Sequence, residues 1–512
     1  MLMPGATEQI DAMGRYPNPF ASIHDPFSSA SDKALGAALF REHCEACHGN
    51  EARGGHGGPS LHERTFVQGR SDWALFRTVT HGVPGTAMAG WKLGRDEVWR
   101  IISYLNEVLS QDSSVADAAP IMKPVTAEEL VNAENTPAEW LTYSGGYSGQ
   151  RFSRLNQINR ENVEQLKAVW VRQLASKDNL RLETVPIVRG SVIYVTALPA
   201  DVYAMDAKSG RVLWRFKHDI TVPLALCCEA NRGVAVLGKS VFFGTEDGHL
   251  IALSADTGKI LWDVTVAGAP KGYALTAAPL VVKDIVIVGI AGGDFATRGF
   301  IDAYDAATGA RRWRFYTVPA PGQPGADTWA GDSANSGGGA AWMTGTFDPK
   351  LNLLYWCVGN PNPDYYGDNR AGDNLYTNSV LALDASTGAL HWYFQFTPHD
   401  THDWDATQTP ILIDSSKVYP DRKLLALANR NGFYYLLDRV TGKFIAGQAY
   451  IRQNWPMDWT VMAIRGCALR RFRHGPAFWY TPHTSGATNW WAASTVRSST
   501  RSMCQLLIRA VW

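Results

Sequence analysis

Residues 204–214 read AMDAKSGRVLW, and the chain returns to this phrase at intervals. Further copies are ALSADTGKILW at 252–262, AYDAATGARRW at 303–313, ALDASTGALHW at 382–392 and LDRVTGKF, without the tryptophan, at 437–444. Each copy is typical of a β-hairpin, because an apolar strand leads into a turn whose glycine accepts a positive φ, and a strand with a large aromatic side chain follows.

The spacing of the repeats predicts the architecture. The tryptophans at 214, 262 and 313 lie 48 and 51 residues apart, which is the length of a unit of four short strands. The gap of 79 residues before Trp392 predicts a long insertion. The pattern therefore predicts the blades of an all-β propeller.

Composition excludes several classes of protein. The 512 residues carry 48 Lys and Arg against 48 Asp and Glu, so no electrostatic footprint for nucleic acid or a membrane surface is expected. Apolar runs such as Ile285–Ile290 are far shorter than the roughly 18 residues of a membrane-spanning helix. A propeller can absorb most of this length, so two units are expected.

The N-terminal unit has a different periodicity. Residues 28–32, SSASD, are typical of a helix cap and precede an apolar stretch that runs to Phe40. Residues 95–109 predict a second helix with one apolar stripe, formed by Val98, Ile101, Ile102, Leu105 and Leu109.

Between these helices, Cys44, Cys47 and His48 form a CEACH motif. This spacing lets two thioethers anchor a porphyrin while the imidazole reaches its iron. A zinc half-site or a redox cysteine pair is the alternative, but no second Cys-x-x-Cys lies nearby. Met88, in a loop framed by Gly and Pro, is the candidate sixth ligand, although a methionine also serves as core filler. The stretch resembles a class I cytochrome c domain, which is all-α.

The other cysteines and the first residues give conflicting indications of compartment. Cys227 and Cys228 are adjacent, Cys357, Cys467 and Cys504 are single, and seven cysteines are too few for a disulfide scaffold. Haem attachment requires an oxidising space, yet Met1–Ala6 lacks the pattern of a signal peptide. We expect a periplasmic protein whose leader is missing from the sequence.

A propeller can be a scaffold without chemistry, but the long insertion argues against this. It contains WAGDSANSGGGAAW at 329–342 and GNPNP at 359–363, and TPHDTHDWD follows at 397–405. With CCEANRG at 227–233 and ANRNGF at 428–433, the chain resembles the quinoprotein alcohol dehydrogenases from about Trp140 to Trp455. These enzymes use pyrroloquinoline quinone (PQQ) on an eight-bladed propeller.

The resemblance implies roles for individual residues around PQQ. Trp342 would lie under the quinone plane, and Cys227 with Cys228 would form a vicinal disulfide above it, or remain two buried thiols. Planar guanidinium groups suit the carboxylates and quinone oxygens of the cofactor, and Thr276 matches a hydroxyl that binds it. The matching arginines are Arg232 and Arg430.

The resemblance also implies a cation beside the quinone, held by oxygen donors. Asn360 and Asp294 match its ligands, although Asp294 stands where the family pattern has glutamate. Asp403 matches the general base. Asp405 is a candidate second carboxylate ligand of the cation. In related enzymes, a second carboxylate accompanies a lanthanide in place of calcium. The alternative is that Asp405 is a solvated loop acid.

The C-terminal segment departs from the family. The 54 residues after Asp458 contain seven Arg and no Asp, Glu or Lys, and 457–479 and 495–512 are interpreted as translated from wrong reading frames. Residues 482–494 again match the family, where Asn489 and Trp490 would line the cofactor site. We expect an incomplete propeller whose stability and activity suffer.

The predicted domains are an extension at 1–29, a cytochrome c domain at 30–112, a linker at 113–137, a partial PQQ-binding propeller at 138–455 and an aberrant segment at 456–512 with a propeller fragment at 480–494. The sequence predicts a quinohaemoprotein that oxidises an alcohol and passes electrons through haem c to an external acceptor, such as a cytochrome c or a quinone-linked carrier. The domain order resembles polyvinyl alcohol dehydrogenases. A non-catalytic propeller that serves a cytochrome as electron carrier or scaffold is the alternative.

Overall fold

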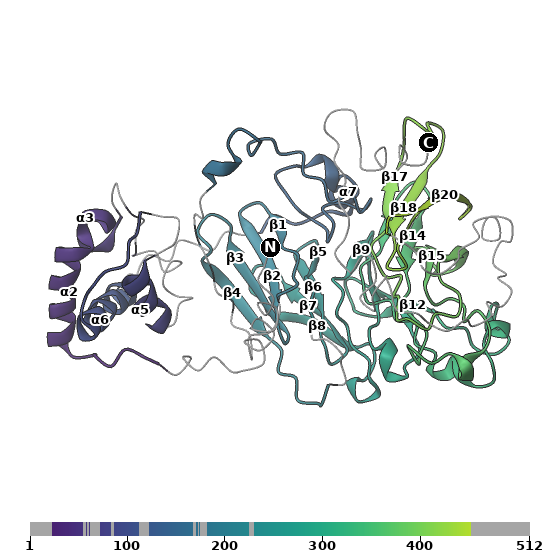
Figure 1. The fold of residues 1–512 in the computed structure, drawn as a ribbon, viewed down its shortest axis with the longest axis horizontal. Helices are drawn as coiled ribbons and strands as arrows, with labels where there is room; N and C mark the ends of the chain where they lie inside the picture. The colour runs from purple at the N-terminus through teal and green to yellow at the C-terminus, as the bar shows by residue number, and fades with distance from the viewer. Residues whose placement is uncertain are drawn as a thin grey trace.

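The structure is a computed structural model of the 512-residue chain. It describes residues 23–54, 58, 61, 72–82, 87–111, 122–166, 170, 172, 174, 182–224 and 230–451. Figure 1 shows a helical N-terminal unit followed by a larger unit built from β-sheets. The predicted extension up to residue 22 and the aberrant segment 456–512 lie outside the described residues.

Both helices predicted for the N-terminal unit are confirmed. Among the described residues of this unit, the α-helices are α2 (Ala30–His43), α3 (Glu45–His48), α5 (Asp72–His81) and α6 (Arg95–Gln111). The Ser29 side chain caps α2 by accepting from the backbone N–H of Asp32 at 3.2 Å. Helices α2 and α6 cross at Gly36, where a Cβ atom would lie 1.9 Å from the carbonyl oxygen of Arg100. Only glycine permits this close approach, which brings the CEACH motif at the end of α2 next to α6.

In the part of the chain that the structure describes, the strands form five four-stranded antiparallel sheets, in which neighbours along the sequence are neighbours in the sheet. The first sheet contains β1 (Ile187–Arg189), β2 (Val192–Ala197), β3 (Asp201–Asp206) and β4 (Val212–Lys217), and the second contains β5 (Ala235–Leu237), β6 (Ser240–Gly244), β7 (His249–Ser254) and β8 (Ile260–Thr265). The third contains β9 (Leu280–Val282), β10 (Ile285–Gly289), β11 (Phe300–Asp305) and β12 (Arg311–Tyr316). The fourth contains β13 (Thr346–Asp348), β14 (Leu353–Cys357), β15 (Ser379–Asp384) and β16 (Leu390–Gln395), and the fifth contains β17 (Ile411–Ile413), β18 (Leu424–Ala428), β19 (Phe433–Asp438) and β20 (Phe444–Ala449).

This arrangement confirms the predicted propeller blades. The first strands of neighbouring sheets lie against one another, as β5 does against β9 and β13 against β17. Strands β10 and β14 are buried along their whole length, because each has a sheet on both sides. The core therefore lies between the sheets.

The repeated tryptophans join each sheet to the next. The indole N–H of Trp214 donates to the carbonyl of Ala255 in the next hairpin at 2.9 Å, and a Cβ atom on Gly258 would lie 2.6 Å from the same ring. Gly258 has φ +69°, so its turn needs glycine for conformation as well as for space. Four further indoles make the same contact, namely Trp170 to Ala207, Trp262 to Ala306, Trp313 to Ala385 and Trp392 to Arg439.

Residues 122–136, within the predicted linker, pack on the propeller. They form α7 (Ala127–Val131), whose Thr126 and Glu129 make a capping box. Val125 pairs with Gly238 through their backbones. The guanidinium of Arg189 in β1 is buried and binds Glu129 at 2.8 Å. This stretch is thereby held against the first two sheets.

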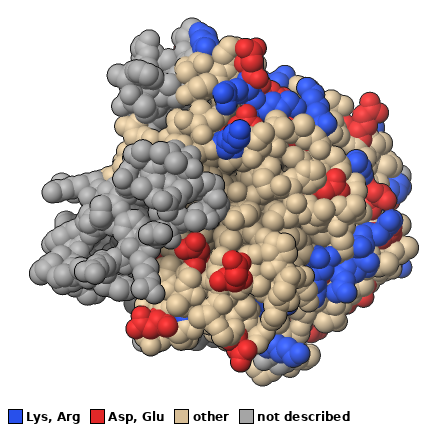
Figure 2. Space-filling model, turned by 90° about the vertical axis from the view of Figure 1, so that its right-hand side faces the viewer, with Lys and Arg blue, Asp and Glu red and all other residues tan. Residues whose placement is uncertain are grey.

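The surface agrees with the balanced charge of the sequence. Figure 2 shows basic and acidic side chains interspersed on the face turned to the viewer. Among the described helices, none combines the length and the apolar character needed to cross a bilayer.

Candidate functional site

The CEACH motif lies where α2 gives way to α3. Cys44 is half-buried at this junction, Cys47 is exposed, and His48 is buried with 8% of its surface accessible. Both thiols are free. Burial, assisted by the Cys47 charge, raises the pKa of the Cys44 thiol to about 11. Two separate thiols and one buried imidazole on a single short segment fit covalent attachment of a haem whose iron is bound by His48.

Met88 lies in the loop before α6. Backbone pairing between Gly82 and Ala89 closes this loop, and the N–H of Trp91 donates to Val79 in α5. The Met88 side chain is half-buried. The loop is thus tied to α5 on one side and continues into α6 on the other.

A first group of predicted residues meets around the Trp342 ring. The guanidinium carbon of Arg232 lies 4.9 Å from the centroid of this ring. Arg232 also donates to the carbonyl of Thr276 and forms a 2.9 Å ion pair with Glu183. Arg232 and Thr276 are buried, with 5% and 4% accessible surface. Glu183 was not predicted, because a single acid before a strand carries no signal in the sequence.

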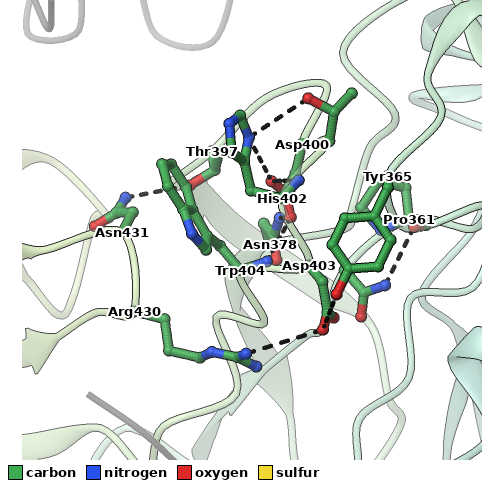
Figure 3. A network of polar contacts seen from close by, with 12 residues as sticks. Pro361, Tyr365, Asn378, Thr397, Asp400, His402, Asp403, Trp404, Arg430 and Asn431 are labelled. Carbon is green, nitrogen blue, oxygen red and sulfur yellow. Dashed lines mark hydrogen bonds and ion pairs between the residues drawn. The ribbon is translucent and has the colours of Figure 1, made fainter. Parts of the chain in front are cut away.

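A second group meets around Asp405, which is buried and accepts three hydrogen bonds. Its donors are the backbone N–H of Asn360 at 3.1 Å, the guanidinium of Arg430 at 3.1 Å and the side chain of Trp342. Arg430 also lies 4.0 Å from the Asp403 carboxylate (Figure 3). Trp342 therefore links the two groups into one network.

The carboxyl groups of Asp403 and Asp405 have higher pKa values than ordinary surface acids. Burial raises the pKa of Asp403 to about 8, and the charges of Asp405 and Asp294 add to this rise while Arg430 opposes it. Burial also raises the pKa of Asp405, again against Arg430. Without a cation, the network holds carboxylates that are reluctant to ionise together.

Asp294 lies in a short 3₁₀ helix, Gly293–Phe295, and is exposed. Its charge acts on Asp403, so it lies near the network. Within the described ranges, no group of three or more His, Cys, Asp and Glu side chains is arranged to hold a metal ion.

Figure 3 shows two loop residues that the sequence analysis did not single out. The Tyr365 hydroxyl donates to Asp403 at 3.4 Å. The Asp400 carboxylate accepts from the Asn378 amide at 2.9 Å and from the backbone N–H of Trp404 at 2.8 Å, which shapes the loop that carries Asp403. Asp403 has φ +57°. The acid-rich TPHDTHDWD segment could have indicated Asp400, whereas Tyr365 carries no sequence signal.

Four predicted cofactor-binding residues, Cys227, Cys228, Asn489 and Trp490, lie outside the described residues. Thr407 Oγ1, Gln408 Oε1 and Asn429 Nδ2, in the segments that carry Asp405 and Arg430, are buried and have no hydrogen-bond partner within the described ranges. Thr407 Oγ1 and Asn429 Nδ2 can donate and Gln408 Oε1 can only accept, and together with two guanidinium groups and an indole the donors fit a planar polyanionic cofactor.

Comparisons with known proteins match both units of the chain. The family described as glucose/ethanol/alcohol dehydrogenase, β-propeller domain, matches residues 140–448. The family described as cytochrome c oxidase, cbb3-type, subunit III, matches residues 31–105. Both resemblances predicted from the sequence are thereby confirmed.

Two curated relatives come from Pseudomonas putida. Quinohemoprotein alcohol dehydrogenase ADH IIB is 40% identical over 382 residues, which cover 70% of this chain and 54% of the relative. Quinoprotein alcohol dehydrogenase PedH is 37% identical over 344 residues, which cover 64% of this chain and 58% of the relative. The chain thus spans little more than half the length of these relatives.

Two solved structures share the fold. Quinohemoprotein alcohol dehydrogenase ADHIIG of Pseudomonas putida HK5 superposes with a TM-score of 0.67 and 36% identity, over 74% of this chain and 58% of that one. A europium-containing methanol dehydrogenase superposes with a TM-score of 0.66 and 34% identity, over 72% and 69% of the two chains.

Proposed function

The chain belongs to the glucose/ethanol/alcohol dehydrogenase β-propeller family, and from that premise we propose that it oxidises an alcohol to an aldehyde or ketone. The observation that carries the proposal is the network itself. Arg232, Trp342, Asp403, Asp405 and Arg430 come from four separate segments and lie in one chain of contacts. A propeller that served only as a scaffold would need no such assembly.

The cofactors of the proposal are PQQ and haem c. When bound, PQQ supplies a two-electron acceptor for hydride, and haem c supplies a one-electron relay. Trp342 offers a flat apolar surface to a planar ring, and Arg232 and Arg430 offer guanidinium donors to its oxygens. The Thr276 hydroxyl is a further donor in the same group. We include Cys227, Cys228, Asn489 and Trp490 in the proposed cofactor set on family resemblance alone.

Asp294, Asn360 and Asp405 are the proposed donors to a calcium or lanthanide ion. All three supply oxygen atoms, which such hard cations require. Asp405 and Asp403 repel each other when both are ionised, and a cation would relieve this repulsion. The europium-containing relative supports the lanthanide alternative.

Asp403 is the proposed general base. With 27% of its side chain accessible, it is more open than Asp405 at 12%, so an alcohol hydroxyl can approach it. Arg430 and a bound cation would keep it ionised at neutral pH, ready to take the hydroxyl proton. The hydride leaves the carbon that carries this hydroxyl group. Proton and hydride together amount to two electrons and two protons lost by the alcohol.

Cys44 and Cys47 are the proposed thioether anchors of the haem, with His48 and Met88 as iron ligands. Such attachment and a Cys227–Cys228 disulfide both need an oxidising space, which supports a periplasmic location. An external acceptor, a cytochrome c or a quinone-linked carrier, would then receive the electrons. Domain boundaries of 30–112 and 138–455 remain part of the proposal, and the family matches to residues 31–105 and 140–448 support them.

The test is reconstitution of the purified chain with PQQ and Ca²⁺ or La³⁺. The proposal expects stoichiometric PQQ, and reduction of the haem band when an alcohol is added. A chain that carries haem but binds no PQQ would overturn the dehydrogenase and leave an electron carrier.

A further inference from the structure

Asn360 is held in one orientation by its hydrogen bonds. It is buried, with 2% accessible surface, and its side-chain nitrogen donates to Asp364 Oδ1 at 2.8 Å and to the carbonyl of Pro361 at 3.2 Å. Both N–H groups of the amide are thus used. Within the described residues, these bonds leave Asn360 Oδ1 as the free acceptor.

The orientation matters because a primary amide has two unlike ends. Rotation by half a turn exchanges a carbonyl oxygen, which can bind a cation, for an NH₂ group, which cannot. A carboxylate contains only acceptors, so Asp364 selects the NH₂ end and turns the oxygen away from itself. The Pro361 carbonyl makes the same selection from the backbone.

The backbone next to Asp364 is held in place by hydrogen bonds from Arg370. The guanidinium of Arg370, fully buried, donates to the carbonyl of the preceding Pro363 at 2.9 and 3.2 Å. The same guanidinium donates to the carbonyl of Asp400 and to the side-chain oxygen of Asn374. One side chain therefore ties the loop that carries Asp364 to the loop that carries Asp403.

We propose that Asp364 is a positioning residue for the cation site, which fixes the Asn360 amide with its oxygen toward the ion. This inference rests on the cation site of the proposed function. It assigns Asp364 an orienting role through Asn360 and requires no direct bond from Asp364 to the ion.

The test compares three chains by cation affinity. Full-length protein, saturated with PQQ, is titrated with Ca²⁺ by calorimetry and with Tb³⁺ by luminescence. Asp364→Leu removes the acceptor, and we expect cation binding about 10- to 100-fold weaker, as for other residues that orient metal ligands. Asp364→Asn is equally neutral but keeps an acceptor oxygen, so it should bind at least about tenfold more tightly than Asp364→Leu.

Controls separate orientation from charge and from folding. Asp368→Asn and Asp368→Leu remove an exposed carboxylate nearby on the same segment and should bind like the parent. Thermal unfolding and the haem spectrum verify the fold, and Asp364→Ala replaces the leucine variant if that variant does not fold. Equal loss in Asp364→Asn and Asp364→Leu would mean that only charge matters, and parent-like binding by Asp364→Leu would also overturn the proposal.

The proposed function can fail separately. If the parent chain binds neither cation with PQQ present, the cation site itself is wrong and the positioning role falls with it. If the parent binds cations while the Asp364 variants do not differ from it, only the positioning role is overturned.

Discussion

Asp403 and Asp405 differ in the protein donors that contact their carboxylate oxygens. Asp405 accepts from Asn360, Arg430 and Trp342, so its carboxylate is committed to protein donors and to any cation it faces. Within the described part of the chain, Asp403 contacts the Tyr365 hydroxyl at 3.4 Å and the more distant Arg430. A base must offer a free oxygen to its substrate, which favours Asp403 for this role.

Asp403→Asn should lower alcohol oxidation by about 10²- to 10⁴-fold in PQQ-loaded protein, because the amide keeps the shape but cannot take a proton. The measurement is turnover with a dye acceptor, alongside the amount of bound PQQ, which should not fall. Asp405→Asn serves as the matched comparison and should lose cation affinity. Unchanged turnover in Asp403→Asn with abolished turnover in Asp405→Asn would place the base two residues later.

Met88→Ala should keep the covalent haem but lower its reduction potential. Loss of a thioether ligand removes the group that raises the potential, whereas the thioether links to Cys44 and Cys47 remain. Haem staining after denaturation and a potentiometric titration measure the two effects. An unchanged potential would show that Met88 is not an iron ligand.

At the scale of elements, the blades depend on contacts between one strand and the following turn. The Trp262 indole on β8 donates to Ala306, and its ring lies 2.9 Å from where a Cβ atom on Gly309 would stand. Gly309 has φ +72°, so the turn is shaped to receive the ring. Neighbouring sheets are therefore joined in two ways: their faces pack together, and an indole on the last strand of one sheet contacts a turn of the next.

Trp262→Ala should destabilise the propeller by about 2–3 kcal/mol, somewhat less than the 3–5 kcal/mol for a fully buried indole, because Trp262 is half-buried. Thermal unfolding followed by circular dichroism should show a lower midpoint. Leu261→Ala changes the neighbouring residue, which is 53% exposed, and should unfold like the parent. Equal midpoints for the two variants would contradict a locking role for the indole.

The helix α7 should give a pH-dependent contribution to stability. The Thr126 N–H and Arg189 lower the pKa of Glu129 to about 2, from 4.5 when unfolded. A depressed pKa stabilises the folded chain above about pH 4.5, and this stabilisation disappears as pH falls toward 2. Glu129 is partly exposed, so we expect only about 1 kcal/mol at pH 7.

Denaturant unfolding of Glu129→Gln across this pH range measures the effect. The difference from the parent chain should be largest at neutral pH and vanish near pH 2. Glu128→Gln, on the same helical turn, lacks the bonds to Arg189 and should show no such dependence. A pH-independent difference for Glu129→Gln would contradict this account.

At the scale of the whole molecule, features that repeat or match a family motif were predictable from the sequence. Contacts between residues that carry neither a repeat nor a motif were not. The repeat predicts the blades because every copy carries the same turn glycine and, in four of five, the same indole. Trp170 was missed as a fifth donor because its surroundings lack the repeated phrase, although it precedes Trp214 by nearly one repeat length. Family motifs led to Trp342, Asp403 and Arg430.

Residues such as Glu183, Asp364 and Arg370 were missed because no recognised motif marks the contacts that give them their roles. Arg370 is an ordinary arginine in the sequence, and only the fold places its guanidinium between two loop carbonyls. No local pattern records that Asp364 faces an amide four residues earlier. The Asp364 contact depends on the path of one loop, and the Arg370 contacts depend on how the β14–β15 loop meets the segment after β16, which no motif in the sequence specifies.

The five indole contacts that join each sheet to the next all run in one direction along the chain. Each donor tryptophan precedes the turn that receives it, from Trp170 and Ala207 to Trp392 and Arg439. A ribosome releases the N-terminal residues first, so every newly made turn meets an indole that has already left the exit tunnel. Assembly during translation can therefore proceed blade by blade, and each added blade leaves the contacts of the earlier ones unchanged.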